Sequence, residues 1–176
     1  DTDVAKWLEA VGFSLACYPD EALEKTADEV IDLIAEAQCE DGYINTYYTI
    51  KEPGKRWTDL CEGHELYTAG HLIEAAVAYY EGTGKKKFLD CVSKFADLIC
   101  DTFGTEEGKI HGYPESCASI GLALFGLRMA QITGESQYID VAERALYNTV
   151  LAGIALDGKS FFYVNPLEVW PDNCME

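Results

Sequence analysis

The stretch Thr83-Gly84-Lys85-Lys86-Lys87-Phe88-Leu89-Asp90 recurs fifty positions later as Thr133-Gly134-Glu135-Ser136-Gln137-Tyr138-Ile139-Asp140. In both copies a Thr-Gly pair precedes three polar residues, an aromatic residue, an aliphatic residue and an aspartate. A glycine between two segments of apolar periodicity is typical of one helix ending and the next beginning. This internal repeat therefore predicts two helical hairpins of the same design, each with its turn at a Thr-Gly pair.

Apolar residues recur with helical spacing on both sides of each Thr-Gly turn. They predict one hairpin over about 62–80 and 86–103, and another over about 116–132 and 135–151. An earlier hairpin, broken at Pro19-Asp20, is predicted from Val4, Trp7, Leu8, Val11, Leu23, Ala27, Val30, Ile31 and Ile34. We therefore expect an all-α chain made of six helices in three hairpins.

Each hairpin is followed by an acidic residue, a glycine and a short apolar segment. These segments are Asp41-Gly42-Tyr43-Ile44, Glu107-Gly108-Lys109-Ile110 and Asp157-Gly158-Lys159-Ser160-Phe161, spaced by 66 and then 50 residues. Such periods are too long and uneven for the ~34-residue units of common helical solenoids. They favour an α/α toroid of the (α/α)6-barrel type, with a short extended segment after each hairpin. Three hairpins would make a partial barrel.

Composition limits the classes of partner. The 176 residues carry a formal charge of -18, from 13 basic and 31 acidic residues, and 48% are apolar. Nucleic acid and anionic membrane are bound mainly through Lys and Arg, so both are poor partners. No apolar run approaches the ~18 residues that span a membrane. We expect a single globular domain over residues 1–176, with reduced thiols and a cytoplasmic location, because the seven cysteines are odd in number and no secretory signal precedes them.

One face of a predicted helix carries polar side chains that could bind a ligand. His64, Tyr67, His71 and Glu74 fall at i, i+3, i+7 and i+10 of the helix predicted over about 62–80, so they share one side. If this side faces a toroid cavity, imidazole, phenol and carboxylate groups would bind sugar hydroxyls. Spacing alone favours the alternative, a surface stripe with one satisfied histidine.

Four further residues are ambiguous from spacing. Glu115 and Cys117 offer a carboxylate and a thiolate to a metal such as zinc, but a zinc site needs three or four protein ligands. The alternative is a buried thiol beside an acid at a helix start. From sequence alone, Glu143 is interpreted as an exposed helix residue, and Tyr163 as part of an aromatic cluster with its neighbours.

Distinctive stretches run through the chain from one end to the other. They are Asp3-Val4-Ala5-Lys6-Trp7-Leu8-Glu9-Ala10, Gln38-Cys39-Glu40-Asp41-Gly42-Tyr43-Ile44-Asn45-Thr46-Tyr47, His64-Glu65-Leu66-Tyr67, Gly70-His71-Leu72-Ile73-Glu74, His111-Gly112-Tyr113-Pro114, Glu115-Ser116-Cys117-Ala118-Ser119-Ile120-Gly121, Ala142-Glu143-Arg144-Ala145-Leu146-Tyr147-Asn148-Thr149-Val150 and Asn165-Pro166-Leu167-Glu168. In these stretches the sequence resembles glycoside hydrolase family 127, whose characterised members are β-L-arabinofuranosidases built on an (α/α)6 barrel.

The resemblance implies a retaining hydrolase that releases L-arabinofuranose from β-L-arabinofuranosides. It implies a zinc ion with Glu115 and Cys117 as two of its four ligands, the others being two adjacent cysteines, one of which is the proposed nucleophile. A glutamate acts as acid and base. It also implies that His64, Glu143 and Tyr163 contact the sugar.

The sequence departs from the family pattern between Pro114 and Glu115, where a long segment with the acid/base glutamate is missing. It also stops before the adjacent cysteine pair. We therefore predict a deletion junction at 114/115, assign no catalytic residue, and expect little or no activity from this chain alone. The favoured interpretation is a fragment or internally deleted member of the family. The alternative is a non-catalytic carbohydrate-binding module or helical scaffold that forms a homodimer through its open ring edges.

Overall fold

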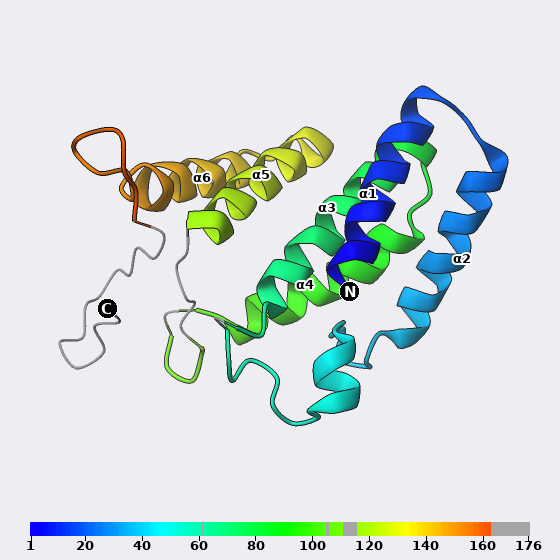
Figure 1. Ribbon diagram of the computed structural model, residues 1–176, viewed down its shortest axis with the longest axis horizontal. Coiled ribbons are helices and arrows are strands. Elements are labelled where there is room, and N and C mark those ends of the chain that lie inside the picture. The colour runs from blue at the N-terminus through cyan, green and yellow to red at the C-terminus, as the bar shows by residue number, and fades with distance from the viewer. Residues whose placement is uncertain (61, 105, 111–115, 163–176) are drawn as a thin grey trace. The chain divides into compact units, whose positions relative to one another are not determined.

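The computed structural model describes residues 1–60, 62–104, 106–110 and 116–162, and the described residues divide between two compact units, 1–112 and 113–176. The first unit contains α1 (Thr2–Cys17), α2 (Glu21–Ala37), the π-helical turn η1 (Tyr47–Lys51), α3 (Glu65–Thr83) and α4 (Lys87–Thr102) (Figure 1). The second contains α5 (Ser116–Thr133), α6 (Ser136–Ala145) and the π-helical turn η2 (Leu146–Val150). Three helical hairpins result, as the sequence predicts.

In the first unit, the first helices of the two hairpins, α1 and α3, run parallel and side by side (Figure 1). Near their N-terminal ends, the hydroxyls of Thr2 and Thr68 lie 3.3 Å apart. Near their C-terminal ends, the backbone of α1 at Gly12 lies directly against that of α3 at Ala78. Contacts follow the same order along both helices, which establishes the parallel direction.

The second helices of the hairpins, α2 and α4, also run parallel to each other. Lys87 at the start of α4 pairs with Asp32 at 2.6 Å, and the Gln38 amide just after α2 donates to the Cys91 carbonyl at 2.8 Å. Paired first helices and paired second helices are what a repeated hairpin produces when it is placed beside itself.

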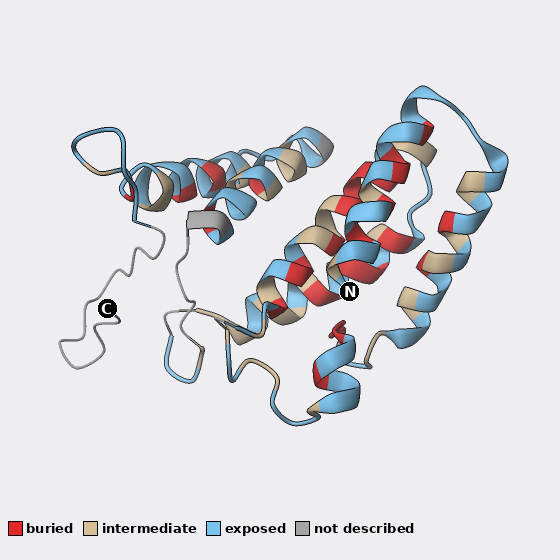
Figure 2. Cartoon of the chain, viewed as in Figure 1, coloured by how far each residue is buried: buried red, intermediate tan, exposed pale blue. Residues whose placement is uncertain are grey.

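The core of the first unit lies mainly between α1 and α3, whose facing sides are buried (Figure 2). By contrast, α2 buries few residues, and most of its surface is exposed. The buried apolar positions on the four helices are Ala5, Leu8, Val11 and Leu15 of α1, Ala27 and Ile31 of α2, Ala69, Leu72, Ala75, Ala76, Val77, Ala78 and Tyr79 of α3, and Phe88, Cys91, Val92 and Phe95 of α4.

Glycines set the distance between α1 and α3. A Cβ atom added to Gly12 would lie 2.6 Å from the Ala78 carbonyl carbon, and one added to Gly82 would collide with the carbonyl oxygen of Gly12. Real Cβ atoms do not approach backbone so closely, so only glycine fits at either position. The two backbones therefore meet here, and this contact fixes how α1 lies on α3.

The repeated Thr-Gly turns have the same conformation. Gly84 and Gly134 are left-handed, with φ of 74° and 73°. In both turns the preceding threonine hydroxyl donates to the carbonyl four residues earlier, at 2.7 and 2.9 Å, and accepts from the N–H two residues later, at 3.2 Å. The internal repeat is thus a repeat of turn chemistry as well as of sequence.

The observed elements differ from the predicted ones in detail. The helix predicted over about 62–80 begins at Glu65, because His64 has a left-handed backbone (φ 52°), and the π-helical turn η1 was not predicted. Short extended segments after the second and third hairpins are present as the bridges Phe103–Ile110 and Ile154–Phe161. In the described part of the chain, no helix is long and apolar enough to cross a membrane.

Two glycines on α3 provide a matched test of the helix contact. Gly82→Ala should lower the free energy of unfolding by about 1–3 kcal/mol, because the added methyl group collides with α1. Gly70→Ala should raise it by up to about 1 kcal/mol, because nothing lies within 4 Å of the new Cβ atom and alanine favours helix. Urea denaturation measures both; equal effects of the two substitutions would contradict the close helix contact.

Candidate functional site

The polar stripe predicted on the third helix exists in the structure. The His64 and Tyr67 rings have centroids 5.8 Å apart and meet edge to face, as do the rings of Tyr67 and His71 at 4.6 Å. His64 and Tyr67 are exposed, whereas His71 is half-buried. Three ring side chains thus follow one another along α3, starting at its first turn. Glu74, one turn further on, is half-buried.

A lysine from α1 joins this stripe. The Lys6 ammonium donates a hydrogen bond to the Tyr67 hydroxyl at 3.2 Å and lies 5.5 Å from the centre of the Tyr67 ring. Burial lowers the pKa of His71, and the charge of Lys6 lowers it further, so His71 is neutral at neutral pH. We call Lys6, His64, Tyr67 and His71 the polar row.

A buried carboxylate stands at the start of the same helix. Glu65 follows His64 directly and is only 1% exposed. One of its oxygens accepts a short hydrogen bond from the Tyr43 hydroxyl, and the other accepts from the Trp57 N–H at 2.8 Å. A buried carboxylate is costly unless it is hydrogen-bonded, and here each oxygen has a donor. Glu65 thereby joins both ends of the long connection between α2 and α3 to the start of α3.

Aromatic packing surrounds this contact. The Tyr43 ring lies edge to face with Trp57 at 5.2 Å and with Phe95 of α4 at 5.5 Å. The Arg56 guanidinium lies 3.9 Å from the centre of the Tyr43 ring and pairs with Asp41 at 2.7 Å. Tyr43 and Trp57 of the connection between α2 and α3 therefore pack against α3 and α4.

Burial and hydrogen bonding act in opposite directions on Glu65. Burial raises its pKa and is the larger influence, while the bonds from Tyr43 and from the Trp57 N–H and the charge of Arg56 lower it. Burial also raises the pKa of Tyr43, and the Glu65 carboxylate raises it further. Tyr43 therefore keeps its proton at neutral pH and donates it to the Glu65 carboxylate.

Two residues with strained backbone, Trp57 and His64, are linked to Glu65. Two non-glycine residues among those described have a left-handed backbone, Trp57 with φ 62° and His64 with φ 52°. Each such residue costs on the order of 1–3 kcal/mol and persists where its surroundings hold it. Glu65 is covalently attached to His64 and accepts the N–H of Trp57, so one side chain lies between the two strained residues.

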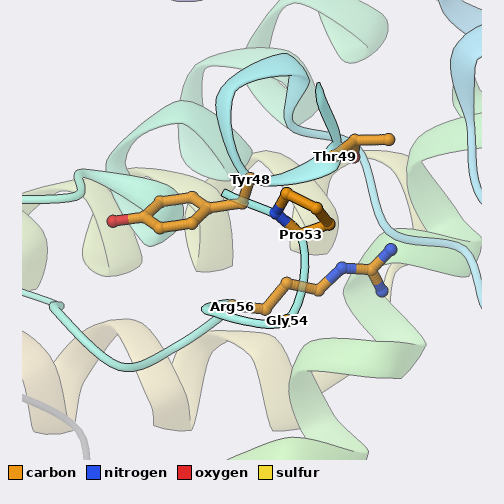
Figure 3. Close-up of a pocket in the computed structure, with 5 residues that line it drawn as sticks. All are labelled: Tyr48, Thr49, Pro53, Gly54 and Arg56. Carbon is orange, nitrogen blue, oxygen red and sulfur yellow. The ribbon is translucent and has the colours of Figure 1, made fainter. Parts of the chain in front are cut away.

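Two of the cavities among the described residues of the first unit are not lined by the polar row. One, of about 360 Å³, is lined by Tyr48, Thr49, Pro53, Gly54 and Arg56 (Figure 3). Figure 3 shows the Tyr48 phenol and the Arg56 guanidinium extending to opposite sides, so they do not converge on a common point. The other, of about 420 Å³, lies among residues of α2, α3 and the start of α4, where Lys85 and Lys87 already pair with aspartates.

The other residues predicted from sequence belong to the second unit or fall outside the described residues. Glu143 lies on α6 of the second unit and is exposed. Glu115, Tyr163 and the predicted junction at 114/115 fall outside the described residues, and only the backbone of Cys117, in the first turn of α5, is described. Within the part of the chain that is described, no group of three or more His, Cys, Asp and Glu residues could hold a metal ion.

Sequence reasoning missed Glu65 and Lys6. A signal for Glu65 was present: it shares a helix face with Ala69, Leu72 and Ala76, four, seven and eleven residues on, and all three are buried. An acid at a core position indicates a buried polar contact. Lys6 gave no such signal, because it meets Tyr67 only after two separate helices pack together.

Hairpins whose first helices run parallel, with a polar row on those helices, place this protein in the α/α-barrel class. The crystal structure of a GH127 β-L-arabinofuranosidase from Geobacillus stearothermophilus T6 matches 100% of this chain and 50% of that protein, with a TM-score of 0.63 and 33% sequence identity. Another solved structure, of a GH127 β-arabinofuranosidase, matches 95% of this chain and 47% of that one, with a TM-score of 0.61 and 26% identity.

Sequence comparison agrees with the structural likeness. The family model for the GH127 β-L-arabinofuranosidase catalytic domain matches residues 1–116 and 109–176. The non-reducing end β-L-arabinofuranosidase of Bifidobacterium longum subsp. longum is 43% identical over 150 residues, which is 81% of this chain and 22% of that protein. The chain therefore belongs to glycoside hydrolase family 127, which confirms the resemblance and the all-α, α/α-barrel fold. It spans about half the length of the solved relatives and 22% of the curated one.

The buried Glu65 predicts a pH-dependent stability. Its raised pKa means that its contribution to stability is complete below the ordinary glutamate pKa and is lost as pH rises through the raised value. Glu65→Gln has no such loss. The free energy of unfolding of the variant, minus that of the wild type, should therefore rise as pH increases above the ordinary glutamate pKa, by ~1.4 kcal/mol per unit of the pKa increase.

Urea denaturation at several pH values measures this difference, with Glu36→Gln as the control because Glu36 is exposed at the end of α2. Parallel pH curves for the wild type and Glu65→Gln would show that the pKa of Glu65 is not raised.

Proposed function

We propose that this chain forms part of the sugar-binding side of a retaining glycoside hydrolase that releases L-arabinofuranose from β-L-arabinofuranosides. The observation that supports this most is the polar row on α1 and α3, in a chain whose relatives are named β-L-arabinofuranosidases. The row combines ring faces with groups that donate and accept hydrogen bonds, which is the chemistry that a furanose with several hydroxyls requires.

Each member of the row has a defined hydrogen-bonding capacity. Lys6 can only donate, so the Tyr67 oxygen accepts from it, and the Tyr67 O–H stays directed elsewhere as a donor to a sugar hydroxyl. The neutral His71 ring has one nitrogen that donates and one that accepts. His64, exposed at the start of α3, adds a further imidazole. Glu143 and Tyr163 are proposed as further sugar contacts by family resemblance.

Replacement of His64 tests the proposal. In the protein expressed from its complete gene, His64→Ala should lower kcat/KM for an aryl β-L-arabinofuranoside about tenfold or more, because a lost hydrogen bond of about 1.5 kcal/mol corresponds to roughly that factor. Lys25→Ala, on the exposed side of α2, is the control and should leave the rate unchanged. If both variants retain full activity and both fold, His64 does not bind the sugar.

The proposal includes a zinc ion, because Glu115 and Cys117 are residue types that bind zinc. Glu115 and Cys117 would supply a carboxylate and a thiolate, both of which zinc accepts, and the remaining ligands would come from residues outside this chain. Zinc bound there would keep cysteine sulfur in its thiolate form at neutral pH. The structure does not describe the Glu115 and Cys117 side chains, so the proposal rests on residue type and family resemblance.

Metal analysis tests the zinc ligands directly. After dialysis, the protein expressed from its complete gene should retain close to one zinc per chain, and Cys117→Ser should lose most of it, because serine is a poor zinc ligand at neutral pH. Cys17→Ser, which replaces an exposed free thiol at the end of α1, should retain the metal. Equal zinc content in the two variants would remove Cys117 from the ligand set.

Other expectations remain predictions. These are the single-domain organisation, the deletion junction, the cytoplasmic location, the lack of nucleic-acid binding and the low activity of residues 1–176 alone. The non-catalytic module and the homodimer are alternatives of a different class. Sedimentation of residues 1–176 at micromolar concentration would show a dimer for the scaffold alternative, and binding of L-arabinose without turnover would indicate the binding module.

A further inference from the structure

The position of His64 is held on both sides along the chain. The preceding residue, Gly63, donates its N–H to the Asp59 carbonyl at 3.0 Å, and a Cβ atom added to it would collide with the Tyr48 hydroxyl and the Asp59 carbonyl oxygen. The following residue, Glu65, is held by two hydrogen bonds from the connection between α2 and α3. His64 itself has the left-handed backbone that joins these two fixed points.

This backbone conformation determines where the imidazole lies. With a helical backbone at His64, α3 would extend by one residue and the imidazole would leave from a different direction. With the left-handed backbone, the ring lies edge to face with Tyr67 at 5.8 Å and becomes the first member of the polar row. The left-handed conformation costs free energy for a non-glycine residue, so contacts made by neighbouring residues must stabilise it.

We propose that Glu65 is a positioning residue for sugar binding. By accepting hydrogen bonds from the Tyr43 hydroxyl and the Trp57 N–H together, its carboxylate holds His64 left-handed and directs the imidazole to the polar row. This inference rests on the proposed function, because it assumes that the row binds the sugar. Glu65 does not itself touch the sugar in this proposal, since it is only 1% exposed.

Filling the buried volume at position 65 would not by itself require a carboxylate. A leucine of similar size would fill the same buried volume without the cost of desolvating a charge, but it would leave the Tyr43 hydroxyl and the Trp57 N–H without their acceptor. What leucine cannot do is accept the Tyr43 and Trp57 donors, which tie the two ends of the connection to the start of α3. The carboxylate contributes orientation, which packing alone does not supply.

The test separates orientation from stability in the protein expressed from its complete gene. The variants are Tyr43→Phe, Glu65→Leu and Glu65→Gln, with Tyr79→Phe as the matched control. Tyr79 is also a buried tyrosine, and its hydroxyl donates to the Asp28 carboxylate at 2.8 Å, but it lies near the opposite end of α3. Tyr43→Phe and Tyr79→Phe thus remove the same kind of hydrogen bond at the two ends of one helix.

Two measurements are made on each variant: kcat/KM for an aryl β-L-arabinofuranoside, and amide hydrogen exchange over residues 58–66. We expect Tyr43→Phe and Glu65→Leu to lower kcat/KM about tenfold or more and to speed exchange in this segment, because a misplaced binding group is costly. Glu65→Gln should recover part of the loss, because its amide still accepts from Trp57. Tyr79→Phe should stay within about twofold of the wild type in both.

The outcomes distinguish this inference from the proposed function. If His64→Ala lowers kcat/KM but Tyr43→Phe and Glu65→Leu behave like Tyr79→Phe, Glu65 does not position His64 and the inference is wrong. If His64→Ala has no effect on kcat/KM, the proposed sugar contact of His64 is wrong, and the positioning role of Glu65 is wrong with it. Should Glu65→Leu not fold, Tyr43→Phe and Glu65→Gln decide the matter, since each removes or alters only one polar contact.

Discussion

The hydrogen bonds to the Glu65 carboxylate hold the start of α3 against the connection that leads into it. Tyr43, near the beginning of that connection, and Trp57, near its end, both donate to this one side chain. Without such a link, a connection of this length would carry a large conformational entropy and could not define the backbone at His64. A second link ties the same connection to the start of α1: the Thr46 hydroxyl and N–H donate to the Asp1 carboxylate at 2.7 and 2.8 Å.

The close approach of α1 and α3 allows residues of both helices to contribute to the polar row. Because Gly12 and Gly82 allow the backbones to meet, and because the helices are parallel, the first turns of both helices lie at the same end of the pair. Lys6 can then reach Tyr67. Bulkier residues at the glycines would separate the helices along their length, and the effect would extend to the polar end although the collision lies at the other. Packing at one end of a rigid helix pair thereby controls a contact at the opposite end.

Local patterns predicted the hairpins, and tertiary contacts determined the site. The Thr-Gly turns could be predicted because the hydroxyl and the left-handed glycine act within five residues. The stripe at His64, Tyr67 and His71 could be predicted because helical spacing is local. The left-handed backbone of His64 could not be predicted, because no local pattern marks it, and the hydrogen bonds of the adjacent Glu65 come from Trp57, eight residues back, and Tyr43, 22 residues back. Lys6 could not be predicted, because its partner lies 61 residues away on another helix. Family resemblance named His64 as a sugar contact without revealing what holds it in place.

The charge of residues 1–176 and the chemistry of the row both agree with the neutral sugar proposed as ligand. With a formal charge of -18, the protein repels anions, and a ligand that carries phosphate or carboxylate would meet that repulsion. A neutral sugar meets none. Its recognition depends on directed hydrogen bonds, which reward orientation more than charge, and a neutral His71 beside a lysine-bound phenol offers such bonds. A site of the proposed kind needs rigid support for each donor, and the buried Glu65, hydrogen-bonded to Tyr43 and Trp57, adjoins the row where the backbone is least favourable.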